Sequence, residues 1–378
     1  MTFDFDDAPD RRAGDSVKWN KYGSDDVIPM WVADMDFRSP PAVVEALAKR
    51  VEQGVFGYSA PLPALADAIC TYLAQRHGWQ ISPDWIVWLP GLVSGLNVVC
   101  RAVGQPGDAV MTAIPVYPPF RSAPKLSGRR VIEVALKQEG SHWGWNWPAM
   151  EAAVTADTRL LLLCSPHNPV GRVWTRQELM EISAFCERHD LVICSDEIHC
   201  DLALDEAGPH LPTAALSADI ANRTITLMAP SKTWNVAGLG CAFAIIPDAR
   251  LRHQVEVAAR GIVPHINLLG YVAAEAAYRH GEPWRLALID YLRGNRDMVM
   301  SELDGYRGVS VSPVQATYLA WIDVRALALA HPCKYFEEAG VGLSDGADFG
   351  MPGFLRLNFG CARPLLEEGI ARFRRAIP

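Results

Sequence analysis

The chain has 378 residues, of which 50% are hydrophobic and 21% charged, which is typical of a globular enzyme and excludes a disordered protein. Its length exceeds what one hydrophobic core usually serves, so we expect two domains. The formal charge of −8, from 35 basic and 43 acidic residues, argues against a nucleic-acid partner. The acidic start is unlike a signal peptide, and no apolar run approaches the roughly 18 residues of a membrane span, so we expect no membrane partner.

The nine cysteines contain no C-x-x-C pair. Several of them, such as Cys70, Cys100, Cys164 and Cys194, lie in apolar runs. This pattern is typical of buried, reduced thiols, and we therefore expect a cytoplasmic protein.

Strand and helix patterns alternate from about residue 60 to 250, which predicts an α/β fold with a mostly parallel sheet. Within this region the loop 89–95 leads into a helix that we expect to begin near Leu96. The backbone N–H groups around Leu92 and Val93 could hold a phosphate there, with help from the helix dipole.

Two polar residues follow neighbouring strands of the expected sheet. Residues 159–164 form a continuous apolar run, as in a strand buried on both faces, and Asn168 follows it. A helix is expected over 175–189, because a Thr-x-x-Glu capping box opens it, and a second buried strand follows at 191–194. This βαβ unit would bring Asn168 and Asp196 to the same sheet edge, where open α/β sheets bind their ligands.

A lysine lies at the same edge. The apolar run 224–228 reads as a strand and continues into Ala-Pro-Ser-Lys-Thr-Trp-Asn, which contains Lys232. Poor solvation lowers the pKa of a lysine amine, and a neutral amine can attack an aldehyde or accept a proton. Each residue alone has an ordinary explanation: Lys232 as a surface lysine, Asn168 as a turn residue, Asp196 as a helix cap or metal ligand. Their common placement at strand ends favours a functional site.

The chain order of four motifs resembles a known family. Asn-Pro-x-Gly, Asp-Glu-Ile-His, Ser-Lys-Thr-x-Asn and a late Leu-Arg-Leu-Asn-Phe are similar to the motifs of fold-type I pyridoxal-phosphate enzymes, the aminotransferase class I/II superfamily. Residues 28–37, 56–58, 237–239 and His199 make the chain most similar to the cystathionine β-lyase-like C–S lyase branch. The resemblance covers the chain from about Trp19 to the last helix.

The resemblance implies a large pyridoxal-phosphate-binding domain and a smaller α+β domain. We expect the large domain, with its mostly parallel sheet flanked by helices, over residues 51–275 and the small one over 276–378. Residues 1–50 are expected to pack with the small domain. A helix through 266–279 would join the two, and strands are expected at 309–311 and 317–322.

The resemblance also implies roles around the cofactor ring. Lys232 would bind pyridoxal 5′-phosphate covalently and then move the Cα proton of the substrate. Asp196 would pair with the pyridine nitrogen and keep it protonated, so that the ring can accept electrons. Asn168 would donate to the phenolic oxygen, His199 would have a similar role, and Tyr117, fixed between prolines, would stack on the ring. Taken singly, His199 is more often a packed histidine, and Tyr117 could fill the core.

At the phosphate end, the chain departs from the aminotransferase pattern. Backbone groups of Leu92 and Val93 and the hydroxyl of Ser231 are expected to hold the phosphate. Many aminotransferases carry an arginine eight residues after the lysine, where this chain has Gly240, which agrees better with the lyase branch. Tyr58 resembles a tyrosine that reaches the phosphate of the neighbouring subunit, which implies a homodimer; alternatively, it anchors a loop.

For the substrate, Arg356 resembles the arginine that holds the α-carboxylate, because a planar guanidinium can donate two parallel hydrogen bonds to it. Arg356 could equally form a structural ion pair, and Arg363 is the competing candidate. Ala33 is expected to line the substrate pocket together with Asp34. No metal site is expected.

The leading hypothesis is a homodimeric lyase that carries out β-elimination on L-cystathionine or another cysteine S-conjugate and releases a thiol, pyruvate and ammonia. An aminotransferase with the same fold and cofactor is the first alternative. The second is a cofactor-bound regulatory protein with secondary lyase activity. Pocket shape, which decides between substrates that differ by a few methylene groups, cannot be read from the sequence.

Overall fold

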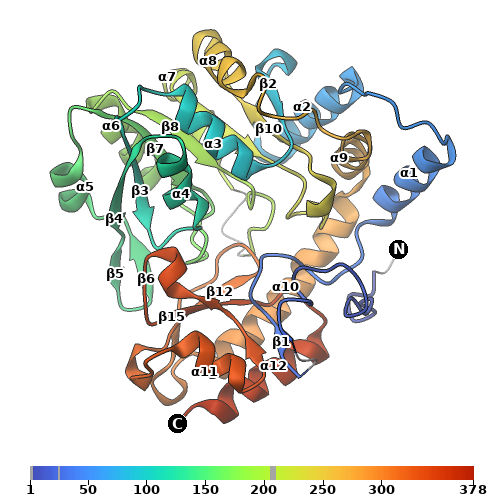
Figure 1. Cartoon of the computed structure of the whole chain (residues 1–378), viewed down its shortest axis with the longest axis vertical. Coiled ribbons are helices and arrows are strands. Elements are labelled where there is room, and N and C mark those ends of the chain that lie inside the picture. The colour runs from blue at the N-terminus through green and yellow to red at the C-terminus, as the bar shows by residue number, and fades with distance from the viewer. Residues whose placement is uncertain (1–2, 24–25, 205–209) are drawn as a thin grey trace.

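The computed structural model describes residues 3–23, 26–204 and 210–378. In this part of the chain a seven-stranded sheet forms the centre of the larger half, in the order β2-β10-β9-β8-β7-β3-β4 (Figure 1). Strands β9, β8, β7, β3 and β4 run parallel to one another, whereas β10 is antiparallel to both β2 and β9. The expected α/β fold with a mostly parallel sheet is confirmed. The strands are β2 (Ile86–Leu89), β3 (Ala109–Ile114), β4 (Arg130–Ala135), β7 (Thr158–Cys164), β8 (Val192–Asp196), β9 (Thr224–Met228) and β10 (Ala242–Ile245).

Helices cover both faces of this sheet, because alternate residues of each strand are apolar on opposite sides. One face packs against α3 (Leu92–Ala102), α4 (Pro119–Leu126) and α8 (Ala249–Ala259). The other face packs against α2 (Pro63–His77), α5 (Trp147–Ala153), α6 (Arg176–Arg188), α7 (Ala218–Asn222) and α9 (Leu268–His280). The sheet is therefore buried on both sides, and its strand ends are the places where polar side chains can meet a ligand.

The predicted βαβ unit is present as β7, α6 and β8. Thr175 caps α6 and forms the full capping box: its hydroxyl accepts from the Glu178 backbone N–H, and the Glu178 carboxylate accepts from the Thr175 N–H. Strand β8 continues two residues beyond the expected end, so Asp196 is its last residue. The unit delivers Asn168 and Asp196 to one edge, as the sequence indicated.

The start expected for helix α3, near Leu96, was wrong by about one turn. Helix α3 begins at Leu92, directly after Gly91, and Ser94 and Gly95 lie inside it instead of in the preceding loop. Gly95 is buried there, and a Cβ atom at this position would lie 3.0 Å from Leu89 Cδ1. The glycine therefore serves close packing of the helix on the sheet. As a result, the N–H groups of Leu92 and Val93 belong to the open first turn of α3.

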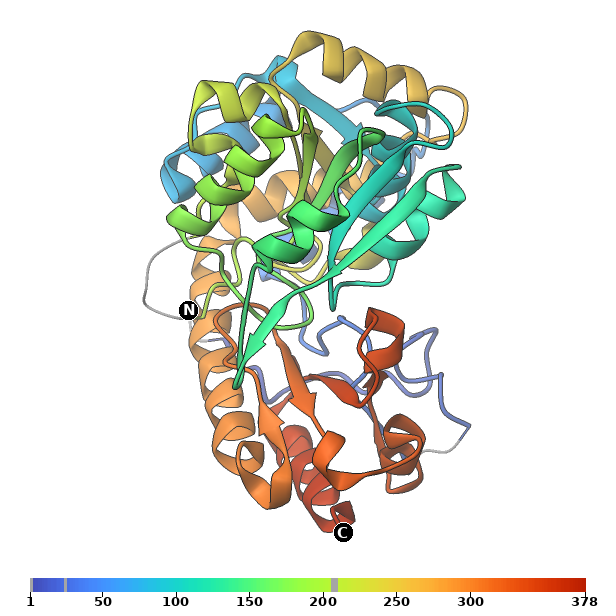
Figure 2. The ribbon, with the colours of Figure 1, turned by 90° about the vertical axis from the view of Figure 1, so that its left-hand side faces the viewer.

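The connection to the smaller half is also different from the expectation. Helix α9 starts at Leu268 and packs against α1 (Pro41–Glu52) and α2. The 22-residue helix α10 (Glu282–Leu303) makes the connection instead, running from the large sheet along the smaller half (Figures 1 and 2). The boundaries expected for the domains stay a prediction.

The smaller half contains a four-stranded sheet in the order β11-β12-β15-β14. The segment before α1 lies beside it (Figure 2), and β1 (Ile28–Pro29) pairs in parallel with β13 (Val341–Gly342). A two-stranded β5-β6 hairpin extends below the large sheet. The remaining elements are β5 (Lys137–Glu139), β6 (His142–Gly144), β11 (Ser310–Val311), β12 (Leu319–Asp323), β14 (Ser344–Asp345), β15 (Phe354–Asn358), α11 (Pro332–Glu338) and α12 (Arg363–Ala376).

The nine cysteines are all free thiols. Cys100, Cys164 and Cys194 are buried as expected, whereas Cys70 on α2 is only half-buried. Within the described residues, the helices are too short or too polar to cross a bilayer.

Candidate active site

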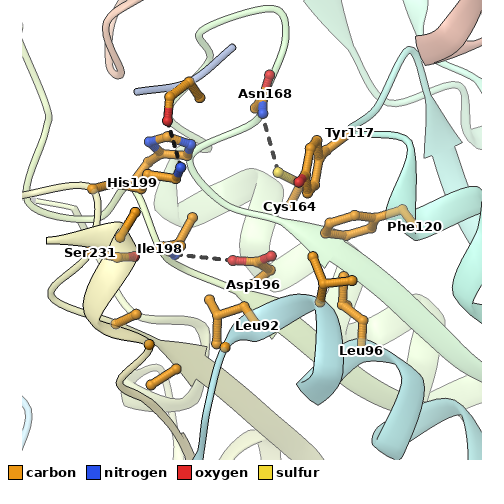
Figure 3. Close-up of a pocket in the computed structure, with 18 of the residues that line it drawn as sticks. Leu92, Leu96, Tyr117, Phe120, Cys164, Asn168, Asp196, Ile198, His199 and Ser231 are labelled. Carbon is orange, nitrogen blue, oxygen red and sulfur yellow. Dashed lines mark hydrogen bonds between the residues drawn. The ribbon is translucent and has the colours of Figure 1, made fainter. Parts of the chain in front are cut away.

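A cavity lies at the carboxyl ends of the central strands, where the large sheet faces the N-terminal segment and β15 (Figure 3). Most residues that the sequence placed at the cofactor or substrate line it. These lining residues are Ala33, Leu92, Val93, Tyr117, Asn168, Asp196, His199, Ser231, Lys232 and Arg356. The exceptions are Tyr58, the competing candidate Arg363, and Asp34, which lines a neighbouring hollow instead.

Asp196 places a carboxylate at the floor of the cavity. The side chain is buried, and its Oδ1 accepts a hydrogen bond from the Ile198 backbone N–H at 3.1 Å (Figure 3). Burial raises the pKa of Asp196 to about 7, although this hydrogen bond and the positive charge of Lys232 act in the opposite direction. A cationic nitrogen placed against Asp196 would lower the pKa again and keep the carboxylate charged.

Lys232 lies in the loop after β9 and points its amine at the N-terminal segment. Its Nζ donates to the Ala33 carbonyl oxygen at 2.6 Å. Burial, with a smaller effect of the Arg356 charge, lowers the pKa of Lys232 to about 8, while the charges of Asp34 and Asp196 oppose this shift. A substantial fraction of the amine is therefore neutral near pH 8, as a nucleophile or proton acceptor requires.

Arg356 on β15 supplies a buried cation. Nη1 donates to Asn168 Oδ1 at 3.0 Å and Nη2 to the Trp31 carbonyl oxygen at 2.9 Å, while Nε has no partner. Burial lowers the pKa of Arg356 to about 10. With no carboxylate paired to it, this guanidinium is suited to an anionic ligand.

The competing arginine lies elsewhere. Arg363 begins α12, donates from Nε to Asn295 Oδ1 at 3.2 Å, and lies 4.6 Å from the ring centroid of Tyr291. It does not line the cavity, and its contacts hold α12 against α10. Position therefore favours Arg356 over Arg363 as the anion-binding residue.

His199 and Tyr117 offer polar and aromatic surfaces to the cavity. His199 is buried and its Nδ1 has no hydrogen-bond partner. Burial lowers the pKa of His199 to about 3, and the nearby charges of Lys232 and Arg356 add to the effect, so the imidazole is neutral. The Tyr117 ring lies beside Phe120 at the cavity wall, above Asp196 in the view of Figure 3.

Glu197, the residue after Asp196, belongs to a separate hydrogen-bond network. Glu197 accepts from Ser195 Oγ at 2.8 Å and from the Thr213 N–H at 2.9 Å, and it pairs with His210 Nε2 at 2.7 Å. Since Glu197 is buried and fully engaged in these contacts, it does not form a metal ligand pair with Asp196.

The open first turn of α3 and Ser231 form one end of the cavity, next to Gly240. Gly240 has φ +57°, and a Cβ atom there would lie 3.2 Å from the Pro90 carbonyl oxygen. A long side chain at this position would be strained. The local backbone thus accounts for the absence of the arginine that many aminotransferases carry at this place.

Tyr58 does not reach the cavity of its own chain. It is fully exposed, and it lines a separate surface hollow with Phe56, His265 and Ile266.

Three residues to which the sequence analysis assigned no role hold the N-terminal part of the site. We call residues 30–37 the strap. The Tyr318 hydroxyl donates to the Ala33 carbonyl oxygen at 3.0 Å. The Asn358 amide donates to the carbonyl oxygens of Val32 and Asp34, at 2.6 and 2.8 Å. The Asn235 amide donates to the carbonyl oxygens of Met35 and Phe37, at 3.2 and 2.6 Å. Asn235 and Asn358 stand in the recognised motifs, but nothing in their spacing points to partners some 200 to 326 residues away.

The cavity fits pyridoxal 5′-phosphate. The amine of Lys232, with its lowered pKa, could react with the aldehyde of the cofactor. The Asp196 carboxylate could pair with its cationic ring nitrogen, and the first turn of α3 could bind its phosphate. The unpartnered nitrogens of His199 and Arg356 leave donors for further polar groups.

Comparison with known proteins agrees with this geometry. Residues 25–373 match the family "Aminotransferase class I and II". The chain belongs to this family.

The chain is 36% identical to the cystathionine β-lyase PatB of Bacillus subtilis, over 99% of both chains. Its structure is similar to a crystal structure of OvoB, with a TM-score of 0.97 and 47% identity over 99% of both chains. It is also similar to Treponema denticola cystalysin, which contains pyridoxal 5′-phosphate, with a TM-score of 0.94 and 32% identity over 100% of this chain and 99% of that one.

These relatives confirm the resemblance to the C–S lyase branch and the fold-type I architecture. They also confirm the expected cofactor, since the family depends on pyridoxal 5′-phosphate.

Proposed function

We propose that the protein is a pyridoxal-phosphate-dependent lyase that cleaves the Cβ–S bond of L-cystathionine or another cysteine S-conjugate. With one water consumed, the products are a thiol, pyruvate and ammonia. The observation that carries the proposal is the single cavity in which Lys232, with its lowered pKa, lies near the buried Arg356 and Asp196. The similarity to a cystathionine β-lyase supports this reaction over others of the family.

Lys232 has two roles in this proposal: it binds the cofactor and later carries a proton. When bound, pyridoxal phosphate withdraws electrons from the Cα atom of the substrate and so makes its proton acidic. The neutral amine of Lys232 accepts that proton, and its pKa of about 8 suits it for both accepting and releasing one. Asp196 holds the ring nitrogen in its protonated form, because a buried carboxylate next to it favours the cation.

The remaining cavity residues orient the cofactor. Asn168, the neutral His199 and the aromatic ring of Tyr117 line the cavity and would hold the cofactor ring. The N–H groups of Leu92 and Val93 and the Ser231 hydroxyl hold the phosphate at the start of α3.

Arg356 positions the substrate. Its guanidinium binds the α-carboxylate, which fixes the Cα–H bond relative to Lys232. Ala33 of the strap also lines the cavity, and its carbonyl oxygen accepts a hydrogen bond from Lys232 Nζ. The thiolate then leaves from Cβ.

An aminotransferase is the second candidate, because the family is named for that activity and shares the same cofactor site. An aminotransferase needs an α-keto acid to complete its cycle, whereas a lyase needs none. The lack of an arginine at Gly240 favours the lyase.

We further propose a homodimer in which Tyr58 binds the phosphate in the partner's cavity. Tyr58 is exposed, and the large side chains near it, Val55, Phe56 and Leu62, are between 59% and 68% exposed. A contiguous group of exposed apolar side chains is typical of a protein interface. The exposed face of Val93 at the start of α3 supports a partner close to the phosphate end of the cavity.

The free thiols support the cytoplasmic location that we propose, because disulfides are rare in that reducing compartment.

The loaded protein is expected to release pyruvate and ammonia from L-cystathionine without any keto acid. Both products can be followed by coupled assays, with Lys232→Ala as the control that lacks the proton carrier. Amino transfer that starts only after a keto acid is added would assign the aminotransferase activity instead.

Substitution of Arg356→Lys is expected to lower kcat/KM by about 100-fold, because a lysine cannot donate two parallel bonds to the α-carboxylate. The matched control is Arg363→Lys, for which kcat/KM should stay within about threefold. Steady-state kinetics on L-cystathionine measure both. Equal losses in the two variants would contradict the assignment of Arg356.

Mixed dimers test the shared site. Refolding a mixture of Lys232→Ala and Tyr58→Ala chains is expected to restore about a quarter of the wild-type activity, because half of the dimers then carry one intact site. Neither variant alone should reach this level. If the mixture stays as inactive as its components, Tyr58 does not act in the partner's cavity.

A further inference from the structure

The Ala33 carbonyl oxygen joins two side chains of the cavity. It accepts hydrogen bonds from Lys232 Nζ at 2.6 Å and from Tyr318 Oη at 3.0 Å. A carbonyl oxygen has two lone pairs, so these two donors use its full capacity. Tyr318 is thereby linked to the Lys232 amine through a single backbone atom.

The position of the Ala33 carbonyl is fixed from both sides along the strap. Asn358 Nδ2 donates to the preceding carbonyl, that of Val32, and to the following one, that of Asp34. Lys18 Nζ also donates to the Asp34 carbonyl, at 3.0 Å. Lys232 and Tyr318 add the two hydrogen bonds to the Ala33 carbonyl itself, and of these two donors Tyr318 takes no part in the proposed chemistry.

Tyr318 itself is held with little freedom. It is 1% exposed, and its ring meets that of His199 edge-on, with centroids 6.1 Å apart and planes at 76°. Gly360 allows this close packing, because a Cβ atom there would lie 3.2 Å from Tyr318 Cδ2 and 2.7 Å from Met35 Cγ. A side chain at position 360 would displace either the tyrosine or the strap.

The residue before Tyr318 has an unfavourable backbone conformation. Thr317 is buried and has φ +76°, which β-branched residues rarely adopt. Its N–H donates to the Leu202 carbonyl oxygen at 2.9 Å, and its hydroxyl accepts from the Leu319 N–H at 3.1 Å. Strain of this kind persists where the surroundings demand a particular direction of the chain. Here that direction turns the Tyr318 hydroxyl toward Ala33.

We propose that Tyr318 is a positioning residue for Lys232: its hydroxyl fixes the Ala33 carbonyl, which then binds one N–H of the free lysine amine. A neutral amine has two N–H groups and one lone pair. When one N–H is bound, rotation about the Cε–Nζ bond is restricted, and the lone pair can face the Cα–H bond that Arg356 holds in place. The inference rests on the proton-transfer role proposed above for Lys232.

The test is Tyr318→Phe in the full-length protein, which removes one oxygen atom. The first readout is the pH dependence of the rate at which the cofactor-free protein takes up pyridoxal phosphate, followed by the absorbance of the cofactor. The wild-type midpoint is expected near pH 8, the pKa of Lys232. In the variant it should move up by about half a unit to one unit, because water in place of the hydroxyl solvates the charged amine.

The second readout is turnover of the loaded enzyme. We expect kcat to fall about tenfold while KM changes less than about twofold, because the orientation of the base is lost but the carboxylate site is intact. The matched control is Tyr335→Phe. The Tyr335 hydroxyl also donates to a backbone carbonyl, that of Ala376 at 2.7 Å, but it lies outside the cavity. This control should change neither readout.

An unchanged midpoint and kcat in Tyr318→Phe would overturn the proposal. So would a variant that fails to fold, because the hydroxyl would then have a structural role. The Lys232→Ala protein separates the two proposals. If the Lys232→Ala protein takes up the cofactor as the wild type does, the role proposed for Lys232 is wrong. If the Lys232→Ala protein loses uptake while the Tyr318→Phe protein behaves as the wild type, only the positioning role of Tyr318 is refuted.

Discussion

An irregular backbone segment that is buried must find donors for its carbonyl groups, and the site depends on how this chain meets that requirement. The strap follows β1 and contains neither helix nor strand. Its carbonyls instead accept hydrogen bonds from side chains and one backbone N–H that arrive from distant parts of the sequence. The donors are Arg11, Lys18, Lys232, Asn235, Tyr318, Ser344, Arg356 and Asn358.

This arrangement couples the structure of the strap to the chemistry of the cavity. Lys232 and Arg356 donate hydrogen bonds to the strap, and they are also the groups proposed to bind the cofactor and the substrate. An unsatisfied buried carbonyl costs about 1–3 kcal/mol, so the strap, the loop after β9 and strand β15 stabilise one another. The same burial changes the acid–base chemistry: it lowers the pKa of Lys232 to about 8 and raises that of Asp196 to about 7. The lowered pKa of Lys232 suits this amine to accept and release a proton near neutral pH.

The sequence could predict what local patterns determine. The apolar runs, the capping box at Thr175 and the turn residues placed Asn168, Asp196 and Lys232 at one sheet edge, and the structure brings them together there. Glycine misled the prediction at the start of α3, because Gly95 is required by packing against β2 and not by a turn. The hydrogen bonds of the strap could not be predicted, since residues such as Tyr318 and Ala33 are 285 positions apart. The role proposed for Tyr58 requires a second chain, and local patterns in one sequence do not define a contact between chains.

The cavity is arranged around the amine of Lys232, and we therefore expect this residue to hold the cofactor. Reduction of the loaded protein with borohydride, followed by protease digestion and peptide mass spectrometry, tests this directly. We expect the added pyridoxyl mass on the peptide that contains Lys232, and on no other lysine peptide. A pyridoxyl group on a different lysine, or a reduced protein without any, would contradict it.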